Sequence, residues 1–259
     1  MKVRLDKLLV ERGIAATRER AQAMIFAGRV LVNEQKVDKP GSPVAPDALL
    51  RMLGEDPLYV GRGGLKLEAA LKHWQVDLSG RFCADVGAST GGFTDCMLQH
   101  GASTVLAIDT GYGQIAQKLR ADVRVSLMER TNARHLKPGD LPAGISFVAM
   151  DVSFISATLV LPPVVAAAGS SLQEIVVLVK PQFEAGREYV GKGGIVRDAE
   201  GHQLAIDRVR ACLERLTGRE IDLIDSPILG AEGNREFLLH ALLNGPGEAE
   251  EDTGSASPG

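Results

Sequence analysis

The 259-residue sequence is poor in cysteine and in long apolar runs. Its three cysteines, Cys83, Cys96 and Cys212, are too few and too scattered for a disulfide framework or a paired-cysteine metal site. The longest mainly apolar stretch, residues 157–168, contains two prolines and is shorter than the roughly 18 residues that a membrane-spanning helix needs. The start of the chain lacks the uninterrupted apolar core of a signal peptide. We therefore expect a cytoplasmic protein with no bound metal and no membrane contact.

Aromatic residues and net charge are also low. Aromatics make up 4% of the chain, and the single tryptophan, Trp74, suits a core position better than an RNA-stacking platform. The formal charge is −4, but residues 246–259 carry four acids and no base, so the rest of the chain is neutral. Residues 1–72 carry 13 Lys and Arg against 9 Asp and Glu. This mild basic bias fits a solvated surface about as well as it fits RNA binding.

The first part of the chain, residues 1–58, has the pattern of a small α+β module with a linker. An apolar face predicts a first helix that ends at Gly13, and Thr17 is a good N-cap for a second helix that runs to Gly28. Short alternating segments then predict a small sheet. Residues 54–57 are typical of a linker.

From residue 59 to residue 243 short apolar segments alternate with amphipathic ones. This alternation is typical of an α/β fold in which crossover helices cover a parallel sheet. We expect seven strands, at residues 82–86, 104–109, 124–127, 145–151, 174–180, 220–226 and 236–242. We expect helices near residues 64–73, 92–99, 114–119, 156–168 and 201–217. Such a doubly wound, Rossmann-like sheet binds ligands at the carboxyl ends of its strands. Residues 244–259 are expected to form a disordered acidic tail.

The sharpest local pattern is DVGASTGGF, residues 85–93, which follows a predicted strand and opens a helix. Its glycines allow a tight turn, and the helix start offers unpaired N–H groups to a ligand. Ser89 stands where a dinucleotide-binding motif has its second glycine, which favours S-adenosylmethionine as the cofactor. Asp109 ends the next strand, where a carboxylate can accept hydrogen bonds from ribose hydroxyls. A plain turn followed by a capping aspartate is the alternative.

Polar residues also stand at the ends of later strands. Asp151 ends the fourth predicted strand and Lys180 the fifth, each after an apolar run. Lys66 and Glu236 look ordinary one at a time, because a helical lysine and a glutamate at a strand start are usually solvated. Asn132 follows the third strand. It could contact the edge of an adenine or cap a helix, and the sequence does not favour either role. The residues expected to bind the cofactor are Asp85, Gly87, Ser89, Gly91, Gly92, Phe93, Asp109, Asn132 and Asp151.

Ten ordered motifs, covering about residues 2–242, resemble the TlyA family, which also carries the historical name hemolysin A. They include RLDKLLVERG near the start, DVGASTGGFTDC at the glycine-rich turn, and VKPQFEAG and EGNREFLL near the end. The resemblance implies a 2′-O-methyltransferase of ribosomal RNA, with an N-terminal RNA-binding module like that of a small-subunit ribosomal protein and a larger FtsJ-like domain. Thr17 stands where serine is usual, which is a conservative departure.

The resemblance to FtsJ-like methyltransferases places a Lys-Asp-Lys-Glu catalytic set on Lys66, Asp151, Lys180 and Glu236. Lys180 is expected to assist deprotonation of the ribose hydroxyl, oriented by Asp151 and Glu236, while Lys66 supplies positive charge near the developing alkoxide. The expected target is a cytidine of 16S rRNA, of 23S rRNA, or of both. The residues expected to contact RNA are Arg4, Lys7, Arg18, Arg20, Arg29, Arg62, Arg187, Lys192 and Arg197.

The long connection of residues 181–200 follows Lys180 and contains four glycines and three bases. A connection of this length is more often functional than accidental. We expect a lid that is mobile in the free protein and closes on RNA. A rigid loop anchored by Phe183, Tyr189 and Ile195 is the alternative.

Two other functions compete with methyl transfer. The historical name invites a membrane-active toxin, which the lack of an export signal, a membrane span and a long amphipathic helix opposes. The second alternative is an RNA-binding ribosome assembly factor without catalytic activity. The presence of all four residues of the catalytic set argues against it.

Overall fold

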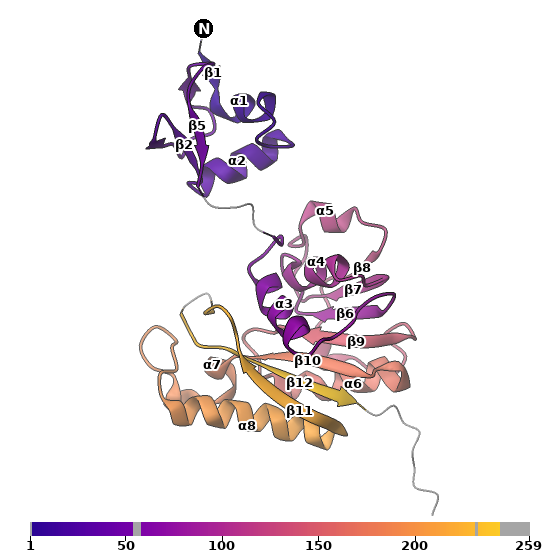
Figure 1. Cartoon of the computed structure of the whole chain (residues 1–259). Coiled ribbons are helices and arrows are strands. Elements are labelled where there is room, and N and C mark those ends of the chain that lie inside the picture. The colour runs from indigo at the N-terminus through magenta and orange to yellow at the C-terminus, as the bar shows by residue number, and fades with distance from the viewer. Residues whose placement is uncertain (1, 54–57, 231–232, 244–259) are drawn as a thin grey trace, which may run out of the picture. The chain divides into compact units, whose positions relative to one another are not determined.

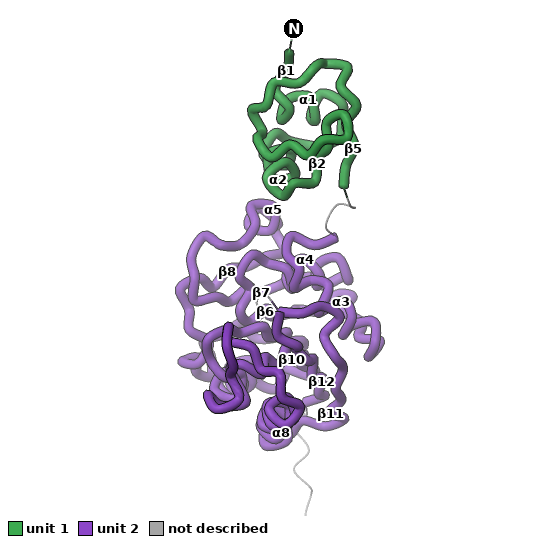
Figure 2. The backbone as a smooth tube through the Cα atoms, turned by 90° about the vertical axis from the view of Figure 1, so that its left-hand side faces the viewer, with its two compact units in different colours: residues 1–57 green, residues 58–259 purple. Residues whose placement is uncertain are grey.

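The structure of the chain, a computed structural model, describes residues 2–53, 58–230 and 233–243 (Figure 1). It divides into two compact units, residues 1–57 and 58–259 (Figure 2). Each unit has its own hydrophobic core. The linker expected at residues 54–57 and the acidic tail expected at residues 244–259 lie outside the described residues.

Within residues 2–53, the described part of the unit of residues 1–57, the chain forms two helices and two small sheets. Its elements are β1 (Val3–Arg4), α1 (Leu5–Glu11), α2 (Arg18–Phe26), β2 (Val30–Val32), β3 (Gln35–Lys36), β4 (Pro43–Val44) and β5 (Leu50–Met52). Thr17 caps α2 as predicted, because its hydroxyl accepts a hydrogen bond from the Arg20 amide. The three-stranded sheet has the order β3-β2-β5, and β1 pairs with β4. The strands β1 and β4 were not predicted, since two residues are too few to show alternation.

A seven-stranded sheet forms the centre of the unit of residues 58–259. Its strands are β6 (Phe82–Val86), β7 (Thr104–Ile108), β8 (Val125–Met128), β9 (Ile145–Met150), β10 (Glu174–Val179), β11 (Gly218–Asp225) and β12 (Phe237–Leu243). Their order is β11-β12-β10-β9-β6-β7-β8. The predicted α/β class and the seven strands are confirmed, with boundaries that differ by two residues or fewer.

One strand departs from the expected parallel arrangement. β12 runs antiparallel to both of its neighbours, β10 and β11, whereas β6 to β10 pair in parallel. β11 and β12 follow each other in the chain, and the described residues between them, 226–230 and 233–236, contain no helix. Parallel neighbours need a long crossover connection, so two strands joined in this way pair antiparallel.

Helices cover both faces of the sheet (Figure 1). They are α3 (Gly63–His73), α4 (Gly92–Gln99), α5 (Gln117–Arg120), α6 (Leu161–Ala168), α7 (Pro181–Glu184) and α8 (Ala199–Arg215). Side chains of α3, α4 and α5 share one apolar core with one sheet face, and those of α6 and α8 share another with the opposite face. The central strands are therefore apolar on both sides, as in other covered parallel sheets.

The expected helix of residues 156–168 is divided in two. A short 3-10 segment, η2 (Ala157–Leu159), precedes α6. Two prolines occupy the first turn of α6, where a missing N–H costs nothing and the fixed φ suits a helix start. The prolines therefore begin a new helix instead of continuing the previous one. The other 3-10 segments are η1 (Ala133–His135), η3 (Gly169–Ser171) and η4 (Arg187–Tyr189).

Candidate active site

The turn after β6 brings two strand ends together. Gly87 has φ of +90°, and a Cβ atom there would lie 2.4 Å from the backbone oxygen of Asp151. Glycine therefore allows the end of β6 to lie against the end of β9. Gly91 is the N-cap of α4 with φ of +96°, and a Cβ there would lie 2.3 Å from a methyl group of Leu119. These two glycines shape the turn.

Asp85 lies beneath this turn and is fully buried. Its Oδ2 atom accepts hydrogen bonds from the Thr94 amide (2.8 Å) and hydroxyl (2.6 Å). Burial raises the pKa of Asp85 to about 7, assisted by the charge of Asp151 and opposed by the Thr94 hydrogen bonds. This placement does not fit the expectation that Asp85 contacts a cofactor, because a fully buried carboxyl offers no surface to a ligand. Asp85 instead ties β6 to α4 and supports the turn from inside.

Three adjoining cavities lie at the carboxyl ends of the strands. Their volumes are about 290, 460 and 130 Å³, and Gly87, Ser89 and Asp151 line all three. Gly92 and Phe93 line the smallest. This edge is where doubly wound sheets bind their ligands. The expected cofactor residues thus meet in one place, except for Asp85 and Gly91, which support the turn.

The cavity of about 290 Å³, which we call the Asp109 cavity, is suited to a nucleoside. Asp109 accepts hydrogen bonds from the Ser89 amide (2.8 Å) and the Gly111 amide (2.6 Å), one at each carboxylate oxygen. Each oxygen can accept a further hydrogen bond, so the fixed carboxylate can receive a pair of hydroxyls. Asn132 lines the same cavity and caps η1 by accepting from the Arg134 amide at 3.1 Å.

The cavity of about 460 Å³, which we call the lysine cavity, contains two ion pairs. Lys66 from α3 pairs with Glu236 at the start of β12, and Lys180 at the end of β10 pairs with Asp151 at the end of β9. The Lys180 Nζ also donates to Ser153 Oγ at 2.8 Å. Both lysines are largely buried, at 8% and 9% exposed. The four residues of the expected catalytic set therefore line one cavity.

The pairing within this set differs from the expectation in one respect. Glu236 contacts Lys66 and not Lys180, which is held by Asp151 and Ser153. The reason is that α3 carries Lys66 to the start of β12, 170 residues away in the chain. Each of the two lysines is thus paired with its own carboxylate. This pairing offsets the free-energy cost of burying a charge.

Phe154 is a site residue that the sequence did not reveal. Its side chain is 91% exposed, its backbone has φ of +64°, and it lines the lysine cavity beside Phe183. The two rings lie 5.5 Å apart. A bulky residue rarely adopts positive φ, and such conformations concentrate at functional sites. The low aromatic content had argued against a stacking surface, and these two rings nevertheless lie together in the lining of the lysine cavity.

Glu184 is a second residue that the sequence analysis missed. It is 4% exposed, and its carboxylate accepts from the Ser156 hydroxyl (2.5 Å) and the Ala157 amide (2.6 Å). Burial raises its pKa, and the hydrogen bond from Ser156 opposes the rise. Glu184 therefore fixes the loop that carries Ser153 and Phe154 to α7. The glutamate of VKPQFE was the available signal, one helical turn after Lys180.

Residues 181–200, expected to be a lid without regular structure, contain α7, η4 and the start of α8. The buried Asn234 side chain holds the second half, because it accepts from the Val196 amide and donates to the Gly194 oxygen, both at 2.9 Å. The anchor is the buried Val196, not Ile195 as the packed alternative supposed. This half of the segment matches the packed alternative, and the mobility of the free protein stays a prediction.

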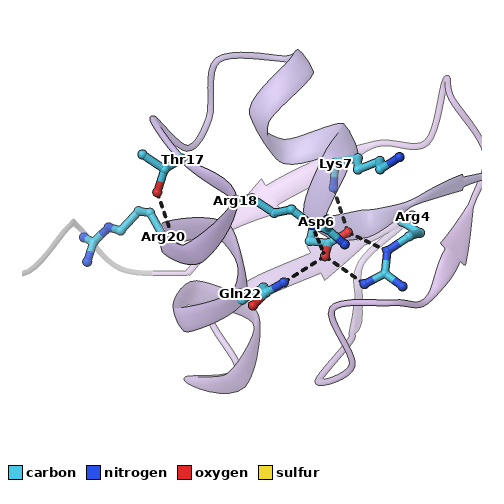
Figure 3. Close-up of polar contacts among 7 residues, drawn as sticks. All are labelled: Arg4, Asp6, Lys7, Thr17, Arg18, Arg20 and Gln22. Atoms are coloured by element: carbon cyan, nitrogen blue, oxygen red, sulfur yellow. Dashed lines mark hydrogen bonds and ion pairs between the residues drawn. The ribbon is translucent and has the colours of Figure 1, made fainter.

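The expected RNA-binding residues of the first unit differ in their contacts with Asp6. Arg4 and Arg18 both reach the buried carboxylate of Asp6 (Figure 3). The Arg20 side chain points away from that carboxylate, and Lys7 contributes only its amide to it. Asp6 therefore holds the Arg4 and Arg18 side chains in place. The sequence alone did not suggest this.

The other expected RNA-binding residues have different surroundings. Arg29 donates to the backbone oxygen of Leu53 at 3.1 Å. Arg62 lines the lysine cavity, next to Lys66. The exposed bases of the segment 181–200 are Arg187, Lys192 and Arg197.

Membrane-spanning helices and metal-ligand clusters are absent from the part of the chain that the structure describes. Across residues 2–53, 58–230 and 233–243, no helix has the length and apolar content for crossing a membrane. Over the same ranges, no group of three His, Cys, Asp or Glu side chains could hold a metal ion.

The chain matches two family models. Residues 59–242 match the FtsJ-like methyltransferase family, and residues 3–50 match the S4 domain. The two matches fall on the two structural units, in the same order along the chain.

Similar proteins cover nearly the whole chain. YqxC of Bacillus subtilis, described as a candidate rRNA methyltransferase, is 50% identical over 96% of this chain and 88% of its own. The 16S/23S rRNA (cytidine-2′-O)-methyltransferase TlyA of Mycobacterium tuberculosis is 40% identical over 92% of this chain and 89% of its own. A solved structure described as a hemolysin candidate from Streptococcus thermophilus is 42% identical, with a TM-score of 0.70, over 94% of this chain and 89% of that one.

Proposed function

The chain belongs to the TlyA family of FtsJ-like methyltransferases, and from this premise we propose that it transfers a methyl group from S-adenosylmethionine to a ribose 2′-hydroxyl of ribosomal RNA. We propose a cytidine as the target nucleotide, because the TlyA relative is named for cytidines of 16S and 23S rRNA. The S4 domain at residues 3–50 supports an RNA substrate.

One observation carries the proposal above all. The two buried lysine–carboxylate pairs, Lys66–Glu236 and Lys180–Asp151, line a cavity that adjoins the Asp109 cavity. A ribose hydroxyl is a weak nucleophile while it keeps its proton, so an enzyme that uses it must align it and help remove the proton. Largely buried lysines that are paired with carboxylates can do both.

The residues around Gly87 fit S-adenosylmethionine. The fixed Asp109 carboxylate can accept two ribose hydroxyls, and Asn132 and Gln114 line the same cavity as polar partners for a base. The smaller cavity between Gly63 and Phe93 would take the amino-acid end of the molecule. Bound there, S-adenosylmethionine would supply a methyl group already activated for in-line displacement.

The chain's own side chains would then act on the RNA. Lys180, held by Asp151 and Ser153, orients the hydroxyl and assists the loss of its proton. Lys66, held by Glu236, places positive charge beside the oxygen as negative charge develops on it. Holding the reactants in near-attack geometry can contribute roughly 7 to 11 kcal/mol. The exposed Phe154 ring, which lies beside Phe183 in the lining of the lysine cavity, offers a face on which the target base can stack.

The proposal is tested by methyl transfer to purified ribosomal subunits. The protein is incubated with 30S or 50S subunits and S-adenosylmethionine labelled in the methyl group, and the modified ribose is located by its resistance to alkaline cleavage. We expect label at one cytidine in at least one subunit and none with Lys180→Met. Label on a base would contradict the proposal. Cofactor binding without any transfer to either subunit would favour the non-catalytic assembly factor.

A further inference from the structure

Asp6 is fully buried and accepts hydrogen bonds from several elements of the unit of residues 1–57. It lies in the first turn of α1. Its oxygens accept from Arg4 Nε (3.0 Å) and Nη2 (2.9 Å), from Arg18 Nε (2.9 Å), from Gln22 Nε2 (3.1 Å) and from the Lys7 amide (2.9 Å). Figure 3 shows side chains of β1 and α2 converging on this one carboxylate. Such complete pairing allows a charge to be buried.

The group of Asp6, Arg4 and Arg18 keeps a net positive charge. The hydrogen bonds from Arg4, followed by those from Gln22 and Arg18, hold the pKa of Asp6 well below its usual range, so it is ionised at neutral pH. One carboxylate therefore faces two guanidinium groups. Both arginine side chains are still 46% exposed. Arg4 uses two of its five N–H donors on Asp6 and Arg18 uses one, so Asp6 engages only a minority of their donors.

Fixing these guanidinium groups favours binding of phosphate. A long side chain loses rotamer freedom when it binds a ligand, and the loss weakens binding. Arg4 and Arg18 have already lost much of that freedom on folding, because Asp6 holds their planar groups in place. Planar guanidinium groups also match phosphate oxygens in pairs, which gives direction as well as charge.

Resting on the proposed function, we propose that Asp6 is a positioning residue for RNA binding. It holds Arg4 and Arg18 as one fixed cationic pair that grips the phosphate backbone of the RNA. Asp6 itself would touch no RNA, since it is fully buried.

The variant Asp6→Asn separates positioning from simple charge. If the arginines acted only through their charge, removing a nearby negative charge would strengthen RNA binding. If Asp6 positions them, the loss of the ion pairs sets them free and binding weakens. We expect RNA affinity about tenfold lower in filter binding with purified 16S and 23S rRNA. The slope of log Kd against log salt should also flatten, because fewer phosphate contacts release fewer counterions.

Asp38→Asn is the matched control, because Asp38 is an exposed acid of the same unit. It should leave RNA affinity unchanged or slightly higher. Thermal unfolding of each variant checks that binding is measured on folded protein. Asp6→Asn protein that is folded and binds RNA as tightly as wild type, or more tightly, overturns the inference.

Arg18→Lys tests the same idea if Asp6→Asn fails to fold. It keeps the charge at a half-exposed position but loses the planar group that Asp6 holds. We expect several-fold weaker RNA binding, and wild-type affinity would overturn the inference. In methylation assays both variants should raise KM for RNA and leave kcat unchanged, because the lysine cavity belongs to the other unit. Wild-type protein that binds RNA without methylating it would refute the proposed function and leave this inference standing.

Discussion

Replacing Asp85 by asparagine should change how the stability of the methyltransferase unit depends on pH. Burial raises the pKa of this carboxyl from its ordinary 3.8 to about 7. Between roughly pH 4 and pH 7 the native protein therefore holds a proton that the unfolded chain has released. Raising the pH through this window favours the state with fewer protons. The free energy of unfolding should fall as the pH rises.

The size of this fall follows from the shift in pKa. Each unit of pKa corresponds to about 1.4 kcal/mol, and the shift is about three units, so the fall is on the order of 4 kcal/mol. Asparagine has nearly the same shape and its oxygen can still accept from Thr94, but it does not titrate. The Asp85→Asn protein should therefore lack this fall in stability between pH 4 and pH 7.

Urea unfolding followed by tryptophan fluorescence measures this directly. Trp74 is the single tryptophan and belongs to the unit of residues 58–259, so its emission reports on that unit. Midpoints and m-values at half-unit steps from pH 4.5 to pH 7.5 give the difference in unfolding free energy between wild type and variant. Asp77→Asn, at an exposed acid of the same unit, should keep the wild-type fall. A constant difference between wild type and Asp85→Asn across this range would show that Asp85 does not keep its proton.

Four further predictions concern the proposed site and the division between the two units. Lys180→Ala should abolish methyl transfer with little change in cofactor affinity by calorimetry, and near wild-type turnover would contradict the assigned role. Asp109→Ala should weaken cofactor binding by roughly 1.5 to 3 kcal/mol, the usual worth of a hydrogen bond to a charged group, and an unchanged Kd would reject the contact. Lys66→Met should destabilise the protein by roughly 3 to 5 kcal/mol, because it leaves the buried Glu236 unpaired. The double variant Lys66→Met/Glu236→Gln should regain stability, measured by urea unfolding, but should not regain methyltransferase activity. A protein without residues 1–57 should bind the cofactor normally and lose most RNA affinity, whereas full RNA binding would refute the division of labour.

Local patterns predicted most of the elements in this fold. Thr17 as an N-cap and the buried strand of residues 82–86 depend on a few neighbouring residues, so the sequence alone identified them. The direction of β12 depends on which strands it lies between, and local periodicity carries no such information. The two-residue strands β1 and β4 are recognisable only through their pairing with each other.

The sequence predicted which charged residues would lie together in the lysine cavity, but not which of them contact each other. The resemblance to a known family named Lys66, Asp151, Lys180 and Glu236, and the structure places them in one cavity. Which lysine meets which carboxylate depends on how α3 packs near the start of β12, and this is a property of the packed fold. Phe154 was missed for a similar reason, since its significance lies in an exposed ring on a left-handed backbone.

The position of β12 sets an order of events during synthesis of the chain. β11 leaves the ribosome before β12, yet β12 lies between β11 and β10 in the finished sheet. Until Phe237–Leu243 has emerged, the apolar β10 is an open edge, and β11 has no strand to pair with. Glu236 emerges at the same moment, so Lys66 stays without its carboxylate until then. A nascent chain that stops short of β12 should therefore be both inactive and prone to aggregate, however completely its earlier strands have folded.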